Sequence, residues 1–151
     1  MSVTVTIPEG FQYVGGALLV TAVTLQGLSH KVSKYRKLSG IEYPQMYAEK
    51  SEAEKSRDAL VFNCAQRAHQ NTLEQIPTLF VAAVISGLKY PIPTAIATMV
   101  WNLSRISYAR GYLTGDPKKR GGPVHFLGAL GGVGLLVSSF VAIGGWILNS
   151  L

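Results

Sequence analysis

The sequence predicts an all-α protein with four transmembrane helices, and two observations carry this prediction. Three stretches without Asp, Glu, Lys or Arg cover residues 10–30, 90–104 and 121–151, and they approach or exceed the ~20 residues that cross a bilayer. The basic residues lie between these stretches: residues 31–58 hold seven basic and five acidic side chains, and residues 110–120 hold four basic and one acidic. Because basic loops stay in the cytosol, both termini are expected on the lumenal side.

Composition also weighs against other classes of protein. A soluble chain would bury such apolar stretches as central helices of a bundle, but this sequence offers almost no amphipathic partners to cover them. The net charge of +6 does not indicate nucleic acid, because the basic residues do not form one face interleaved with aromatics. The single cysteine, Cys64, excludes an intrachain disulfide and a multi-cysteine zinc site. We expect one integral membrane domain over residues 1–151.

The first span is expected at about residues 11–29, and its helix should continue through the basic segment HKVSKYRK. The N-terminus has no positive n-region and no cleavage site follows the apolar stretch, so this span is interpreted as a retained anchor. Gly40 and Pro44 should end the helix. The polar, Glu/Lys-rich residues 41–58 are expected to form a surface loop.

The remaining spans follow from turn residues. A second span is expected at about residues 59–88, interrupted by Pro77, which removes a backbone hydrogen bond. The Pro-rich connection KYPIP leads to a third span at about 91–112, and the turn TGDPKKRGG leads to a fourth at about 123–148. In the fourth span, small residues should allow close helix contact: Gly128, Gly131 and Gly132.

The second span carries an unusual polar stripe. Arg67, Asn71 and Glu74 are spaced i, i+4, i+7 and share one helix face with Gln70, while His69 points elsewhere. The cost of inserting two charges roughly cancels the gain from the apolar residues of this span. The stripe must therefore face protein or a wet cavity.

Two interpretations of the stripe stay open. Arg67 and Glu74 could satisfy each other and fix helix register. Alternatively, the stripe could bind a small zwitterionic ligand, because a guanidinium takes a carboxylate, a carboxylate takes an ammonium and an amide binds peptide groups. The second interpretation also gives Asn71, Gln70 and His69 a task, and ionisable residues within membranes are commonly functional.

The third span supplies a matching face, with Trp101, Arg105, Tyr108 and Tyr112 at i, i+4, i+7 and i+11. An interfacial aromatic belt is the alternative explanation. Basic clusters follow at the ends of the first and third spans: Lys34, Arg36 and Lys37, and Lys118, Lys119 and Arg120. They are either topology signals or cations that lower the pKa of a ligand thiol so that it reacts as the thiolate.

Four motifs carry a family resemblance. VSKYRK, EYPQMY, FNCAQRAHQNTLE and SYARGYLTGDPKKR occur in this order. Over about residues 11–148 the chain resembles the MAPEG superfamily, membrane-associated proteins in eicosanoid and glutathione metabolism, and most closely its type 3 microsomal glutathione S-transferases.

The resemblance implies a four-helix membrane protein that assembles as a homotrimer, with glutathione bound between subunits near the cytosolic face. It assigns five residues to glutathione within the subunit: Arg67, Asn71, Glu74, Tyr108 and Tyr112. Arg36 and His69 would contribute from the neighbouring subunit. Arg120 would stabilise the thiolate, and Lys37 stands where the leukotriene synthase branch has a second catalytic arginine.

This sequence departs from the leukotriene synthase branch in two further ways. The loop between Tyr112 and Arg120 is one residue longer, so Lys119 is the alternative thiolate-stabilising residue. Gln75 replaces an aromatic residue of that branch. Together with Lys37, this weakens any assignment of a specific leukotriene substrate.

The implied function is a membrane-bound glutathione transferase or peroxidase. Glutathione would be the co-substrate, and a lipophilic electrophile or a lipid hydroperoxide would reach the site from the membrane lipids, with no metal implied. The rival is a non-catalytic member that presents lipid or serves as an accessory subunit; a transporter would need more spans. The endoplasmic reticulum is the expected location, with the mitochondrial outer membrane as second choice.

Overall fold

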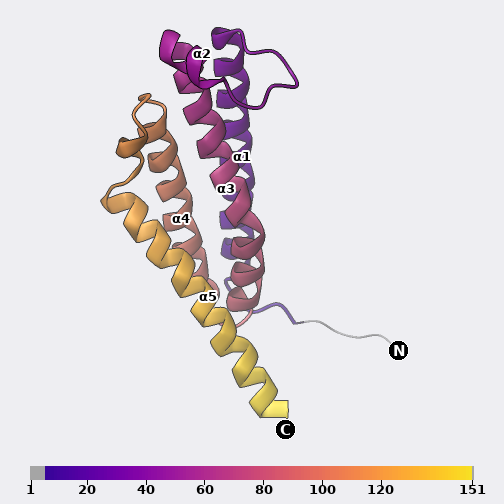
Figure 1. Ribbon diagram of the computed structural model, residues 1–151. Helices are drawn as coiled ribbons and strands as arrows, with labels where there is room; N and C mark the ends of the chain where they lie inside the picture. Colours follow the sequence, from indigo (N-terminus) through magenta and orange to yellow (C-terminus); the bar gives the residue numbers. More distant parts are fainter. Residues whose placement is uncertain (1–5, 151) are drawn as a thin grey trace.

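The computed structural model describes residues 6–150, and within them the chain is helical without any strand (Figure 1). This confirms the all-α prediction. The elements in order are α1 (Phe11–Ser39), the short α2 (Lys50–Lys55), α3 (Arg57–Gly87), α4 (Pro91–Tyr112), the 3-10 helix η1 (Pro117–Arg120) and α5 (Pro123–Ser150). The four long helices agree closely with the four predicted segments.

The long helices run alternately up and down, so that α2 and η1 lie at one end and the C-terminus of α5 at the other (Figure 1). Helices α3 and α4 pack against each other, and α1 and α5 each pack against both of them. Asn102 of α4 is fully buried and donates from its side-chain amide to the carbonyl of Ala17 on α1 at 3.2 Å. This bond fixes α1 against α4.

Both ends of the first connection carry a local backbone signal, of which the break at Gly40 was predicted. Gly40 follows α1 with φ of 69°, the left-handed conformation that glycine adopts without strain. The side chain of Ser56 accepts a hydrogen bond from the Ala59 amide and caps α3.

The prediction of a loop over the whole of residues 41–58 was wrong, because α2 forms within it and α3 begins at Arg57. A capping box made by Glu49 and Glu52 supports α2. Helix α2 is six residues long and has no buried residue. It therefore leaves no apolar periodicity in the sequence from which a helix could be recognised.

The three glycines for which close helix contact was predicted, Gly128, Gly131 and Gly132, lie against α4. A Cβ atom on Gly128 would collide with the side chain of Ser104, and one on Gly131 would lie 3.2 Å from the carbonyl oxygen of Ala97. Gly132 faces Trp101. Small residues therefore set the distance between these two helices.

Helices α1 and α5 are long and apolar enough to cross a membrane, while α3 and α4 do not meet the same criterion of length and composition. In both α1 and α5, only 22% of the most apolar segment is buried. A helix at the centre of a soluble bundle would be mostly buried, so this exposure argues against such a bundle. Large apolar side chains such as Leu19, Phe126 and Phe140 are exposed instead. Helix α3 intersperses its apolar residues with polar and charged ones, Asn71 and Glu74 among them.

Candidate ligand-binding site

The predicted polar stripe exists on α3 and is open to the outside of the chain. Nη1 of Arg67 lies 3.4 Å from Oε1 of Glu74, and the two side chains are 46% and 50% exposed. The pair that one interpretation predicted has therefore formed, but it is not sealed within the helices of its own chain. Both charged groups remain accessible to a ligand.

A buried arginine of α4 lies behind the stripe. Arg105 is only 1% exposed, and it donates from Nη2 to the side-chain oxygen of Asn71 at 3.2 Å and from Nη1 to that of Gln75 at 3.3 Å. Its guanidinium also lies over the ring of Tyr108, 4.1 Å from the centroid. Because Asn71 accepts from Arg105 through its oxygen, the amide orientation on the stripe is fixed from behind.

The two tyrosines of α4 continue this face towards η1. Tyr108 and Tyr112 are buried and meet edge to face with ring centroids 5.0 Å apart. The imidazole of His125 on α5 lies 4.9 Å from the Tyr108 ring. Beyond them, the guanidinium of Arg120 lies 5.8 Å from the Tyr112 ring centroid.

Helix η1 is held in a defined position. The side chain of Asp116 accepts from the Lys118 amide and caps the turn, and Nη1 of Arg120 donates to the Pro117 carbonyl at 2.8 Å. The side chains of Lys119 and Arg120 are both exposed. Of the two, Arg120 is the one that contacts a predicted site residue.

Arg36 is buried in the structure of the single chain. Its Nη1 donates to the carbonyls of Ile41 at 3.3 Å and Gln45 at 2.7 Å, and its guanidinium lies over the rings of Tyr43 and Phe62. Arg36 thus anchors the loop over residues 41–49 (the anchored loop). Its contribution to a neighbouring subunit's glutathione stays a prediction.

Tyr47 of the anchored loop reaches the stripe. Its hydroxyl donates to the side-chain oxygen of Gln70. Burial raises the pKa of Tyr47 above its ordinary value, against the opposing effect of the Arg67 guanidinium. The hydroxyl therefore stays protonated at neutral pH and can act as a donor.

Two predicted residues lie away from this group. Lys37 is exposed on α1, beside a surface hollow that it lines with His30 and Lys34. His69 is half-buried on α3, and among the described residues it makes no hydrogen bond or ring contact. His69 was expected to contribute from the neighbouring subunit and Lys37 to occupy a second catalytic position, and both roles stay predictions.

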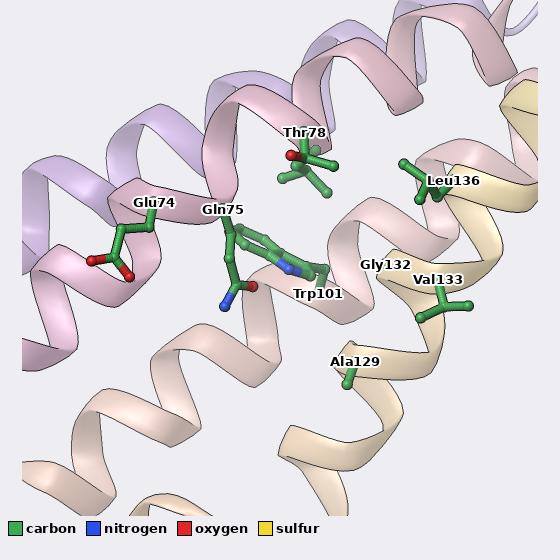
Figure 2. A pocket seen from close by; sticks show the side chains of 9 residues that line it. Glu74, Gln75, Thr78, Trp101, Ala129, Gly132, Val133 and Leu136 are labelled. Carbon is green, nitrogen blue, oxygen red and sulfur yellow. The ribbon is translucent and has the colours of Figure 1, made fainter.

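An apolar cavity of about 350 Å³ adjoins the stripe between α3, α4 and α5 (Figure 2). Gln75 and Trp101 lie next to each other at one wall, and Ala129, Val133 and Leu136 of α5 form the opposite wall (Figure 2). Glu74 stands at the edge. Polar and apolar surfaces therefore meet beside Glu74.

The sequence did not reveal every member of the site. The stripe on α4 included Arg105, but nothing indicated that it would bind Asn71 and Gln75. Tyr47 was missed because it belongs to a loop whose course periodicity does not predict. His125 lies three residues after the turn over residues 114–122, and no motif in the sequence indicated that it would contact Tyr108.

Among models of protein families, that of the MAPEG family matches this chain over residues 14–141. The matched segment includes α3, α4 and η1 and with them the stripe, the two tyrosines and Arg120.

Proposed function

The chain belongs to the MAPEG family, and from this premise we propose that it is an integral membrane enzyme that activates glutathione as a thiolate. The thiolate is used for conjugation to lipophilic electrophiles, for reduction of lipid hydroperoxides, or for both. Within the family we place the chain with the type 3 microsomal glutathione S-transferases. All four long helices cross the membrane, the subunits form a homotrimer, and both termini are lumenal.

The observation that carries this proposal is the exposed pair of Arg67 and Glu74. The amino-acid end of glutathione bears an ammonium and a carboxylate on one carbon, so the two charges lie about as far apart as the 3.4 Å between the Arg67 and Glu74 atoms. Glu74 accepts from the ammonium, and Arg67 donates to the carboxylate. Both residues belong to α3, and a half-exposed ion pair within one helix contributes little to stability, so a purely structural role accounts poorly for it.

The rest of glutathione is then directed along the face of α4. The amide of Asn71, oriented by Arg105, binds a peptide group of the ligand. Tyr108 and Tyr112 lie between the stripe and Arg120, so the thiol of the bound glutathione is directed towards the Arg120 guanidinium. The positive charge of the guanidinium lowers the pKa of the thiol. The thiol then releases its proton to water and becomes the thiolate.

The apolar cavity beside Glu74 gives a lipophilic second substrate a place that adjoins the polar stripe. In conjugation, the sulfur forms a bond to carbon and a halide or similar group leaves with the bonding electrons. In peroxide reduction, the sulfur attacks the peroxide oxygen, an alcohol leaves, and a second glutathione converts the sulfenic acid to the disulfide and water. The membrane of residence is proposed to be the endoplasmic reticulum.

The test uses purified protein in lipid nanodiscs. Glutathione is added and the ultraviolet absorbance of the thiolate is recorded, and then turnover is assayed side by side with an aryl halide and a lipid hydroperoxide. We expect a thiolate band and turnover of at least one substrate. If no thiolate band and no turnover were observed, the result would favour the rival function. That rival is a non-catalytic subunit that presents lipid from the same apolar cavity.

A further inference from the structure

We propose that Tyr47 is a further ligand-binding residue, whose hydroxyl joins Arg67 in holding the carboxylate at the amino-acid end of glutathione. This inference rests on the proposed function. Tyr47 lies outside the helices that carry the other site residues, in the anchored loop between α1 and α2. The loop would then form one wall of the glutathione site.

The anchored loop is fixed firmly enough to place a side chain. Asn63 of α3 makes two hydrogen bonds to the backbone of Ala48: its side-chain oxygen accepts from the amide at 2.7 Å, and its side-chain nitrogen donates to the carbonyl at 2.9 Å. Arg36 holds two carbonyls on the other side of Tyr47. The backbone is therefore held by hydrogen bonds both before and after Tyr47 in the sequence.

The position of the hydroxyl points to a charged ligand. It donates to Gln70, which stands three residues after Arg67 and four before Glu74 on the same helix. The charges of Arg67 and Glu74 both act on the phenol. The donor is thus engaged by a neutral amide, although it stands beside a guanidinium.

A carboxylate is a better acceptor than that amide. When Glu74 takes the ammonium of the ligand, Arg67 is released to bind the carboxylate of the same carbon. A second donor beside the guanidinium can then bond to the same carboxylate, whose two oxygens accept about four hydrogen bonds. Exchanging a neutral acceptor for a charged one strengthens the hydrogen bond of the Tyr47 hydroxyl.

Equilibrium dialysis with the full-length protein in nanodiscs tests this assignment. The two probes are glutathione and γ-aminobutyryl-cysteinyl-glycine, which lacks only the carboxylate in question. The variants are Tyr47→Phe, which removes the hydroxyl and keeps the ring, and Tyr43→Phe as the matched control in the same loop. We expect Tyr47→Phe to weaken glutathione binding about tenfold, as for one lost hydrogen bond to a charged group, and Tyr43→Phe to leave it unchanged.

The analogue gives the sharper result. Because it lacks the carboxylate, it should bind to the wild type and to Tyr47→Phe with equal affinity.

The contrary outcomes separate the two proposals. Wild-type protein that binds glutathione, together with a Tyr47→Phe variant of the same affinity, would overturn the role of Tyr47 and leave the proposed function standing. Equal weakening of both probes by Tyr47→Phe would overturn the assignment to the carboxylate. Wild-type protein that binds neither probe would overturn the proposed function and this inference with it.

Discussion

The backbone carbonyl of Lys119 lies where a Cβ atom on Gly111 would be. Gly111 belongs to the last turn of α4, and its missing side chain lets η1 fold back directly onto that helix. The neighbouring residue Tyr112 then meets the guanidinium of Arg120. A single glycine thus determines how close the proposed thiolate-stabilising residue comes to the tyrosines.

Gly111→Ala should therefore displace η1 and lower turnover while leaving the helices intact. The clash is with backbone atoms, which cannot rotate away as a side chain can. We expect kcat to fall about tenfold or more, a loss of about 1.4 kcal/mol or more in transition-state stabilisation. The change is measured as kcat with an aryl halide at saturating glutathione.

Gly121→Ala is the matched control, because a Cβ atom at Gly121 meets nothing within 4 Å. Its turnover should equal that of the wild type. Equal turnover of Gly111→Ala and wild type would show that the position of η1 does not limit the reaction.

Arg120→Ala should lower turnover far more than glutathione affinity. The cation acts on the charge that develops at sulfur, whereas the binding contacts on α3 remain. The thiolate absorbance of bound glutathione should fall in parallel with kcat. Lys119→Ala should leave the thiolate absorbance and kcat unchanged. If Lys119→Ala lowered them and Arg120→Ala did not, the thiolate-stabilising role would belong to Lys119.

Arg105→Met should weaken glutathione binding about tenfold without a comparable loss of kcat at saturation, as expected when a hydrogen-bonded orientation is lost. The substitution keeps an unbranched apolar side chain, shorter than that of arginine, and removes both donors, so Arg105 no longer orients the amide of Asn71. The dissociation constant is measured by equilibrium dialysis. Arg110→Met, on an exposed position of the same helix, is the control and should bind as the wild type does.

The positions of the four long helices could be predicted from the sequence. Apolar stretches, the basic clusters and the residues Gly40 and Pro44 located the four long helices, because these features act through local backbone preferences and solvation. The stripe of Arg67, Asn71 and Glu74 followed from helical spacing alone. Its pairing with a partner face on α4 was likewise expected from the register of Tyr108 and Tyr112.

The remainder depends on contacts between segments distant in sequence. Tyr47 reaches Gln70 only because Asn63 and Arg36 hold the loop, and no short pattern records such a combination. The buried Arg105 satisfies Asn71 across a helix interface, which spacing within one helix cannot reveal. Helix α2 depends on a capping box and not on burial, so its signal was weak.

Gly128→Ala should destabilise the packing of α5 on α4. The added Cβ atom would collide with the side chain of Ser104, whose hydroxyl is held by the Trp101 carbonyl at 2.7 Å. Overpacking of this kind typically costs about 1–3 kcal/mol. We expect a lower midpoint of thermal unfolding in nanodiscs.

Gly134→Ala is the control on the same helix, because nothing lies within 4 Å of a Cβ atom there. Its midpoint should match or slightly exceed that of the wild type, since alanine favours helix over glycine. Equal midpoints for both variants would contradict the close contact at Gly128.

The central claim is that the exposed pair of Arg67 and Glu74 binds glutathione and does not merely stabilise the fold. The most direct measurement compares glutathione affinity and thermal unfolding of the wild type with those of the double variant Arg67→Gln, Glu74→Gln in nanodiscs. We predict that the wild type binds glutathione, and that the variant loses at least about a hundredfold in affinity with little change in its unfolding midpoint. A variant that unfolds at a much lower temperature yet binds glutathione as the wild type does would contradict the account.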